Sequence, residues 1–73
     1  MNRRLTAIIQ RENDGYVALC PEFDIASQGG SIEEARNNLQ EALDLFFECA
    51  PPEEIGRRAA SEVFVTQLEV AGG

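Results

Sequence analysis

The sequence predicts an α+β fold in a single domain, residues 1–73, with the element order β-β-β-α-β. Three patterns favour this fold: apolar alternation over 5–9, a long helical pattern after Ser31, and a β-prone run over 62–70. A chain of this length buries only about 60% of the surface that its unfolded form exposes. We therefore expect an oligomer or a partner to add stability.

Two strands are expected near the N-terminus, joined by the turn residues 13–15. One alternative is a two-residue turn at Asp14-Gly15. We favour a three-residue turn with Gly15 in the left-handed region, which pairs Glu12 with Tyr16. This register gathers five apolar side chains on one face of the hairpin: Leu5, Ala7, Ile9, Val17 and Leu19.

A short third strand and one long helix are expected next. Pro21 ends the second strand, and the third is expected over 25–28. Ser31 and Glu34 form a capping box at the start of the helix, which must end before Pro51. The apolar stripe that should pack on the sheet is Ile32, Ala35, Leu39, Ala42, Leu43, Phe46 and Ala50.

The last strand is expected over 62–70, after a connector over 53–61 with at most one helical turn. A right-handed crossover places it beside the first strand, giving a four-stranded mixed sheet in the order 3-2-1-4 with the helix on one face. Both faces of this strand are apolar, so a second subunit is expected to cover one of them. The predicted oligomer interface is Val63, Val65 and Phe47.

Charge restricts the class of partner. Thirteen acidic residues against six arginines leave a net charge of −7, with no lysine or histidine. Such a chain repels phosphate backbones, so no direct nucleic-acid binding is expected and a basic protein is the favoured partner. No apolar run approaches the length of a membrane span, and no secretory signal is recognised. We therefore expect a cytoplasmic protein with no membrane partner.

Catalytic chemistry is not expected. The chain has no histidine or lysine, one tyrosine, and no glycine-rich phosphate loop, so no enzyme activity and no cofactor are predicted. Cys20 and Cys49 lack metal-site spacing and are expected to be buried, reduced thiols. Metal-assisted hydrolysis is a rival interpretation, but Asp14, Glu22 and Asp24 fall in turns, so no metal site is predicted.

The outer face of the helix is strongly acidic. Asp44 and Glu48 repel each other at i, i+4 and lie near the negative end of the helix dipole, where stability alone would favour a basic residue. This face is either a solvated surface or a landing surface for a basic partner. Phe23, in the loop after Pro21, either fills its own core or enters a partner's pocket. The predicted partner-binding residues are Glu22, Phe23, Asp24, Glu41, Asp44 and Glu48.

Residues 14–48 resemble the HicB-like antitoxin family. The resemblance lies in Gly15-Tyr16, Pro21 followed by an acidic residue, Gln28-Gly29, the SIEEA helix start at 31–35, and EAL at 41–43. It implies a partial RNase H-like domain without catalysis. It also implies that the protein neutralises a small, basic, RNA-cleaving HicA-like toxin by covering the toxin's active site.

One point separates this chain from that pattern. Many members of the family carry a C-terminal DNA-binding domain, and this chain ends after its predicted fourth strand, so operator binding is not expected. The alternative function is a self-associating small-ligand or structural module, a homodimer or higher oligomer with no toxin partner.

Overall fold

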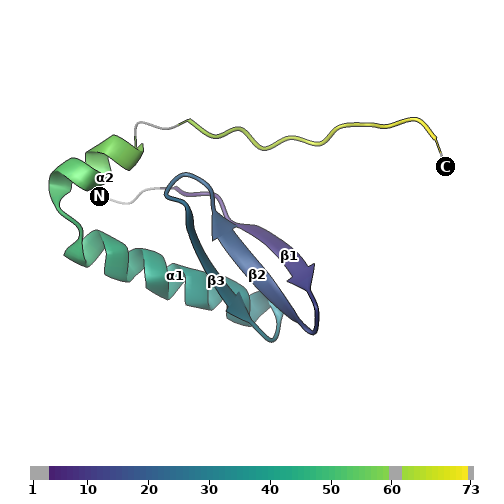
Figure 1. Cartoon of the computed structure of the whole chain (residues 1–73), viewed down its shortest axis with the longest axis horizontal. Helices are drawn as coiled ribbons and strands as arrows, with labels where there is room; N and C mark the ends of the chain where they lie inside the picture. Colours follow the sequence, from purple (N-terminus) through teal and green to yellow (C-terminus); the bar gives the residue numbers. More distant parts are fainter. Residues whose placement is uncertain (1–3, 60–61, 73) are drawn as a thin grey trace.

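The computed structural model describes residues 4–59 and 62–72. Three strands form one antiparallel sheet in the order β1-β2-β3, and a long helix packs on one face of it (Figure 1). The α+β class is as predicted. The elements, in chain order, are β1 (Ile8–Glu12), β2 (Gly15–Cys20), β3 (Ile25–Gly29), α1 (Ile32–Cys49) and α2 (Pro52–Ala59).

The β1–β2 hairpin turns over two residues, so the predicted three-residue turn is wrong. Glu12 pairs with Gly15, and Asn13 adopts the left-handed conformation with φ 53°. Asparagine tolerates this region because its short polar side chain can hydrogen-bond locally. Gly15 is needed for a different reason: a Cβ there would lie 2.8 Å from the carbonyl oxygen of Gly29 in β3.

The new register turns the other face of β2 toward the helix. Ile9 lies opposite Ala18, and both Ala18 and Cys20 are buried. Val17 and Leu19, predicted to face the core, lie on the opposite face and are half-buried. A shift of one residue in pairing exchanges the two faces of a strand, which accounts for the error.

Both boundaries of α1 follow the predicted signals. The Ser31 hydroxyl accepts a 3.0 Å hydrogen bond from the Glu34 amide, and the Glu34 carboxylate accepts a 2.8 Å bond from the Gly30 amide. These bonds satisfy two amides at the start of the helix. Ala50 takes an extended conformation, and Pro51 follows it, as the restriction before proline requires.

The core lies between α1 and the sheet. Ala35, Leu39 and Leu43 are buried along one stripe of the helix, as predicted. Ile32, predicted to belong to this stripe, is 54% exposed because it is the first helical residue. Cys49, predicted to be buried, is exposed, whereas Cys20 is a buried free thiol.

The chain after α1 differs from the prediction. Residues 52–59 form a full helix, α2, with Pro52 in its first position and Arg57 and Arg58 in its last turn, where they suit the helix dipole. Residues 62–72 are extended chain outside the sheet and lead away from the body (Figure 1). A fourth strand within this chain is therefore not confirmed.

Candidate partner-binding surface

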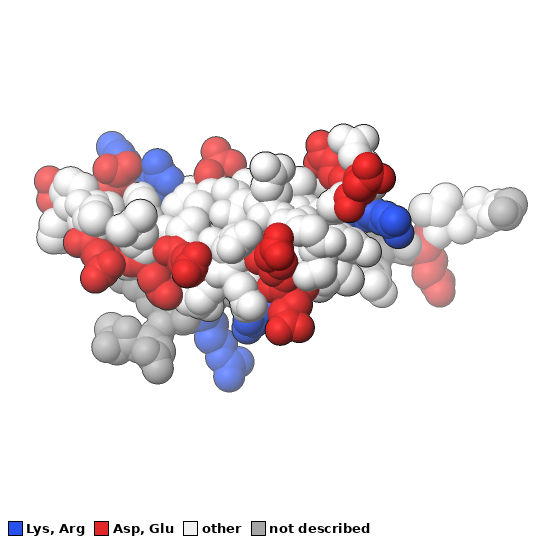
Figure 2. Space-filling view, turned by 90° about the horizontal axis from the view of Figure 1, so that it is seen from below, with Lys and Arg blue, Asp and Glu red and all other residues white. Residues whose placement is uncertain are grey.

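Three of the predicted partner-binding residues form one stripe on α1. Glu41, Asp44 and Glu48 are all exposed and follow one another at i, i+3 and i+7, on the side of the helix opposite Leu39 and Leu43. Figure 2 shows that acidic side chains are spread along the face of the molecule that α1 presents. We call Glu41, Asp44 and Glu48 the acidic stripe.

The acidic stripe is not neutralised within the described part of the chain. The two ion pairs there join Glu54 to Arg57 and Arg58, both in α2. Asp44 accepts a 3.1 Å hydrogen bond from the side-chain amide of Gln40, which is an uncharged donor. The last turn of α1 has no basic residue. No described basic side chain therefore pairs with the acidic stripe, and a cationic group of a partner could approach it.

Leu45 is a surface residue that the sequence pattern did not single out. It lies outside the predicted core stripe and is 58% exposed. On a helix it lies next to Glu41 at i−4 and Glu48 at i+3. An exposed leucine bordered by carboxylates gives the surface an apolar contact within a polar rim, which is the usual composition of a protein interface. By helical periodicity Leu45 lies at the margin of the apolar stripe. Whether such a residue is buried depends on how the helix packs on the sheet, which the sequence pattern does not show.

Glu22 is held inside the chain rather than presented to a partner. Its carboxylate accepts bonds of 2.9 and 3.1 Å from the Thr6 amide, and a 2.7 Å bond from the Thr6 hydroxyl. Partial burial raises the pKa of Glu22, but the bonds from Thr6 outweigh it, so the pKa lies below its usual value. The predicted role of Glu22 in binding is not supported, because its charge fastens the segment before β1 to the end of β2.

The thiol of Cys20 lies beside this carboxylate. Its sulfur is 3.5 Å from a Glu22 oxygen. Burial first, and the neighbouring negative charge next, raise the pKa of Cys20 above its usual value. The thiol is therefore neutral and unreactive, as expected for a small core residue.

Phe23 fills the core of its own chain. It is 1% exposed, and its ring centroid lies 5.5 Å from that of Phe46 and 5.0 Å from that of Phe47. Its predicted contact with a partner is therefore not supported, and the core-filling alternative describes it. Asp24 is exposed in the same turn, with φ 54°.

The predicted oligomer residues fall in two places. Phe47 is half-buried in the aromatic cluster and also lines a groove beside β1. Val63 and Val65 lie in the extended segment, where Val65 is 62% exposed.

Metal-ligand clusters and membrane-spanning helices are both absent from the described part of the chain. Among residues 4–59 and 62–72, no group of three histidine, cysteine or acidic side chains could hold a metal ion. Neither α1 nor α2 is long and apolar enough to cross a bilayer.

The fold and surface define a small α+β protein whose long helix covers one face of a three-stranded sheet and carries an acidic outer stripe. No protein-family model and no solved structure match the chain. It is 46% identical to the UPF0150 protein ssl0738 of Synechocystis over 50 residues, 66% of this chain and 69% of the relative. It is 29% identical to a UPF0150 protein of Helicobacter pylori over 68 residues, 92% of this chain and 94% of the relative. The chain belongs to the UPF0150 family.

Proposed function

We propose that this protein is a non-catalytic binding module of the HicB-like type, which neutralises a small, basic, RNA-cleaving toxin by direct contact. The observation that carries the proposal is the exposed, unneutralised acidic stripe on α1, Glu41, Asp44 and Glu48. The resemblance of residues 14–48 to HicB-like antitoxins supports the same function. Under this proposal the partial RNase H-like sheet has four strands, with residues 62–70 supplying the fourth.

The acidic stripe suits a basic partner for two reasons. Its field raises the encounter rate with a cationic protein, and its repulsion of nucleic acid keeps the module from competing for the toxin's substrate. The stripe also costs stability, because Asp44 and Glu48 lie near the negative end of the helix dipole. A binding partner with lysine or arginine side chains offsets that cost in the complex.

Co-expression tests the proposal. The protein is produced together with the small basic protein encoded by the neighbouring reading frame, and cell growth is measured. We expect the wild-type chain to relieve growth arrest and to co-elute with that protein, and the triple variant E41K/D44K/E48K to do neither. The matched control is E12K/D14K/E53K, which changes the net charge equally at exposed positions outside α1. Equal rescue by both variants would contradict the assignment of the acidic stripe as the binding surface.

Self-association is a second candidate function, favoured by one observation. The apolar side chains of the extended segment are exposed, and a groove of complementary chemistry lies beside β1. A structural or small-ligand module built on this contact would need no toxin. Failure of both rescue and co-elution, together with a stable oligomer, would favour this second candidate.

A further inference from the structure

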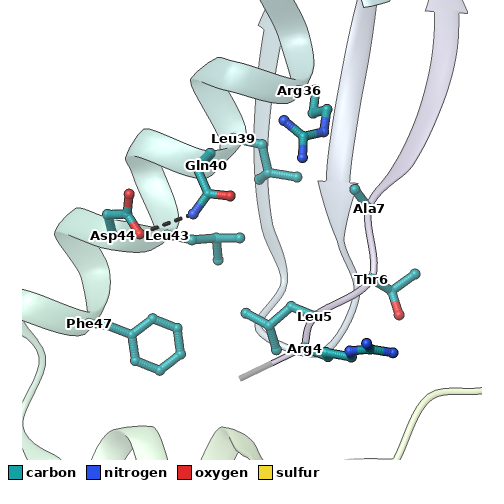
Figure 3. Close-up of a pocket in the computed structure, with 10 residues that line it drawn as sticks. All are labelled: Arg4, Leu5, Thr6, Ala7, Arg36, Leu39, Gln40, Leu43, Asp44 and Phe47. Atoms are coloured by element: carbon teal, nitrogen blue, oxygen red, sulfur yellow. Dashed lines mark hydrogen bonds between the residues drawn. The ribbon is translucent and has the colours of Figure 1, made fainter. Parts of the chain in front are cut away.

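β1 is an edge strand with an open side. It pairs with β2 alone, so the backbone amides and carbonyls along its other edge have no strand partner. α1 lies over β3 and β2 and only touches β1. This offset leaves a groove of about 790 Å³ between α1 and residues 4–7 (Figure 3). We call it the β1 groove.

The β1 groove combines an apolar floor with a basic group at each end. Leu5, Leu39 and Leu43 point into it from the two sides. Arg4 lies at one end and Arg36 at the other (Figure 3). Neither arginine forms an ion pair with the described residues, and Arg36 makes one 3.4 Å hydrogen bond to its neighbour Asn37. Asp44 also lines the groove, where it accepts a hydrogen bond from the side-chain amide of Gln40, so two arginines and one carboxylate leave a net positive charge there. The groove therefore suits an extended peptide that is both apolar and acidic.

Residues 62–72 have this chemistry. The segment contains two carboxylates, Glu62 and Glu69, and β-branched or aromatic residues at most positions between them. Phe64, Leu68 and Val70 are 86%, 85% and 87% exposed. An extended segment with so much exposed apolar surface is unfavourable in water and forms strand pairs readily.

The segment does not fill the groove of its own chain, since none of its residues lines it. Arg58 fixes α2 to the body through a 2.6 Å hydrogen bond to the carbonyl of Phe23, and residues 62–72 run past the sheet without joining it and end beyond β1 (Figure 1). Its largest side chains remain exposed in the single chain. A reciprocal exchange between two copies fills two identical grooves and covers two edge strands at once, which closes the assembly as a symmetric dimer.

We propose that two copies of this chain form a strand-exchanged dimer, in which residues 62–72 of each copy lie in the β1 groove of the other. Their backbones extend the three-stranded sheet beside β1, and their apolar side chains pack on the half-buried Leu5 and Phe47, which line the groove. Arg4 and Arg36 meet the carboxylates of the exchanged segment. The inference concerns self-association and holds whether or not the protein binds a toxin.

Complementary charge reversal tests the exchange in the full-length chain. The variants R4E/R36E and E62R/E69R each put like charges on groove and segment, and each should raise the dimer dissociation constant at least tenfold, as measured by sedimentation equilibrium. Mixing the two variants restores opposite charges only between different chains. We therefore expect the mixture to recover particles of twice the 8.0 kDa chain mass.

A matched variant controls for net charge. E41R/E48R carries the same charge change as E62R/E69R, but on the acidic stripe, and keeps both groove and segment, so by itself it should form dimers as the wild-type chain does. Equal loss of dimer in E41R/E48R and E62R/E69R would overturn the assigned contact, and so would failure of the R4E/R36E and E62R/E69R mixture to restore dimers. A monomeric wild-type chain at millimolar concentration would overturn the dimer itself.

A second measurement keeps the proposal testable if a charge variant does not fold. In an equimolar mixture of isotope-labelled and unlabelled wild-type chains, isotope-filtered NMR should show contacts between the Phe64 ring of one chain and the Leu5 methyl groups of the other. Contacts seen only within one chain would mean that the segment folds onto its own sheet, and would contradict the exchange.

Discussion

The guanidinium of Arg58 donates a 2.6 Å hydrogen bond to the carbonyl oxygen of Phe23, 35 positions earlier in the chain. The same guanidinium lies 5.1 Å from the centroid of the Phe46 ring and 3.3 Å from the Glu54 carboxylate. One side chain thus joins α2 to the turn between β2 and β3 and to the end of α1. This contact positions the start of the extended segment.

Replacing Arg58 should loosen α2. Arg58→Ala removes a charge-assisted hydrogen bond and leaves the Phe23 carbonyl without its donor, so we expect the free energy of unfolding to fall by about 1.5 to 3 kcal/mol in urea. Arg57→Ala is the control, because that side chain is 77% exposed and 3.9 Å from Glu54. It should change stability by less than about 0.5 kcal/mol. Equal effects would contradict the role given to Arg58.

Gly29 should tolerate no side chain. A Cβ there would lie 2.6 Å from the Ala35 amide nitrogen, which belongs to the backbone of α1. Gly29→Ala must push the helix from the sheet, at a cost of about 1 to 3 kcal/mol. Gly30→Ala is the neighbouring control, because its nearest atom, a Glu34 carboxylate oxygen, is 3.8 Å away. Thermal unfolding of both variants measures the difference, and similar melting temperatures would contradict the close packing.

Glu22 should make stability depend on pH in the acidic range. Its pKa in the folded chain lies below the ordinary value of 4.5, so its contribution is complete above about pH 4.5 and is lost as the pH falls through the folded pKa. Glu22→Gln cannot accept the charged bonds from Thr6 and should lose about 1 to 2 kcal/mol at pH 7. Urea unfolding from pH 7 to pH 2 should show the two chains converging at low pH.

The control for this pH dependence is Glu12→Gln, an exposed residue of β1. It should shift stability by less than about 0.5 kcal/mol at pH 7. A constant gap between Glu22→Gln and the wild type across the whole range would show that the lost interaction does not depend on the charge of Glu22.

Local signals predicted much of this fold. The Ser31–Glu34 capping box and Pro51 identify the ends of α1 because each acts within a few residues. The hairpin register was less accessible, since Asn13, Asp14 and Gly15 all tolerate a turn. The register that forms brings Gly15 of β2 close to Gly29 of β3. This is a contact between strands, which local sequence signals do not reveal.

The candidate surface was predicted only in part, because local patterns identify the helix residues but not the loop residues. Helical periodicity places Glu41, Asp44 and Glu48 opposite the core, and the structure confirms their exposure. The loop residues Glu22 and Phe23 carry no periodic signal. Their burial depends on Thr6 and Phe46, which are distant in the chain, so sequence patterns could not decide between a core role and a binding role.

A binding titration tests the central claim most directly. The purified chain and the basic protein encoded by the neighbouring reading frame are titrated by calorimetry at low and high salt. The account predicts a complex that E41K/D44K/E48K weakens about tenfold or more, since exposed pairs contribute about 0.2 to 1 kcal/mol each, and whose salt dependence is reduced in that variant. No complex with the wild-type chain, or equal affinity for the triple variant, would contradict it.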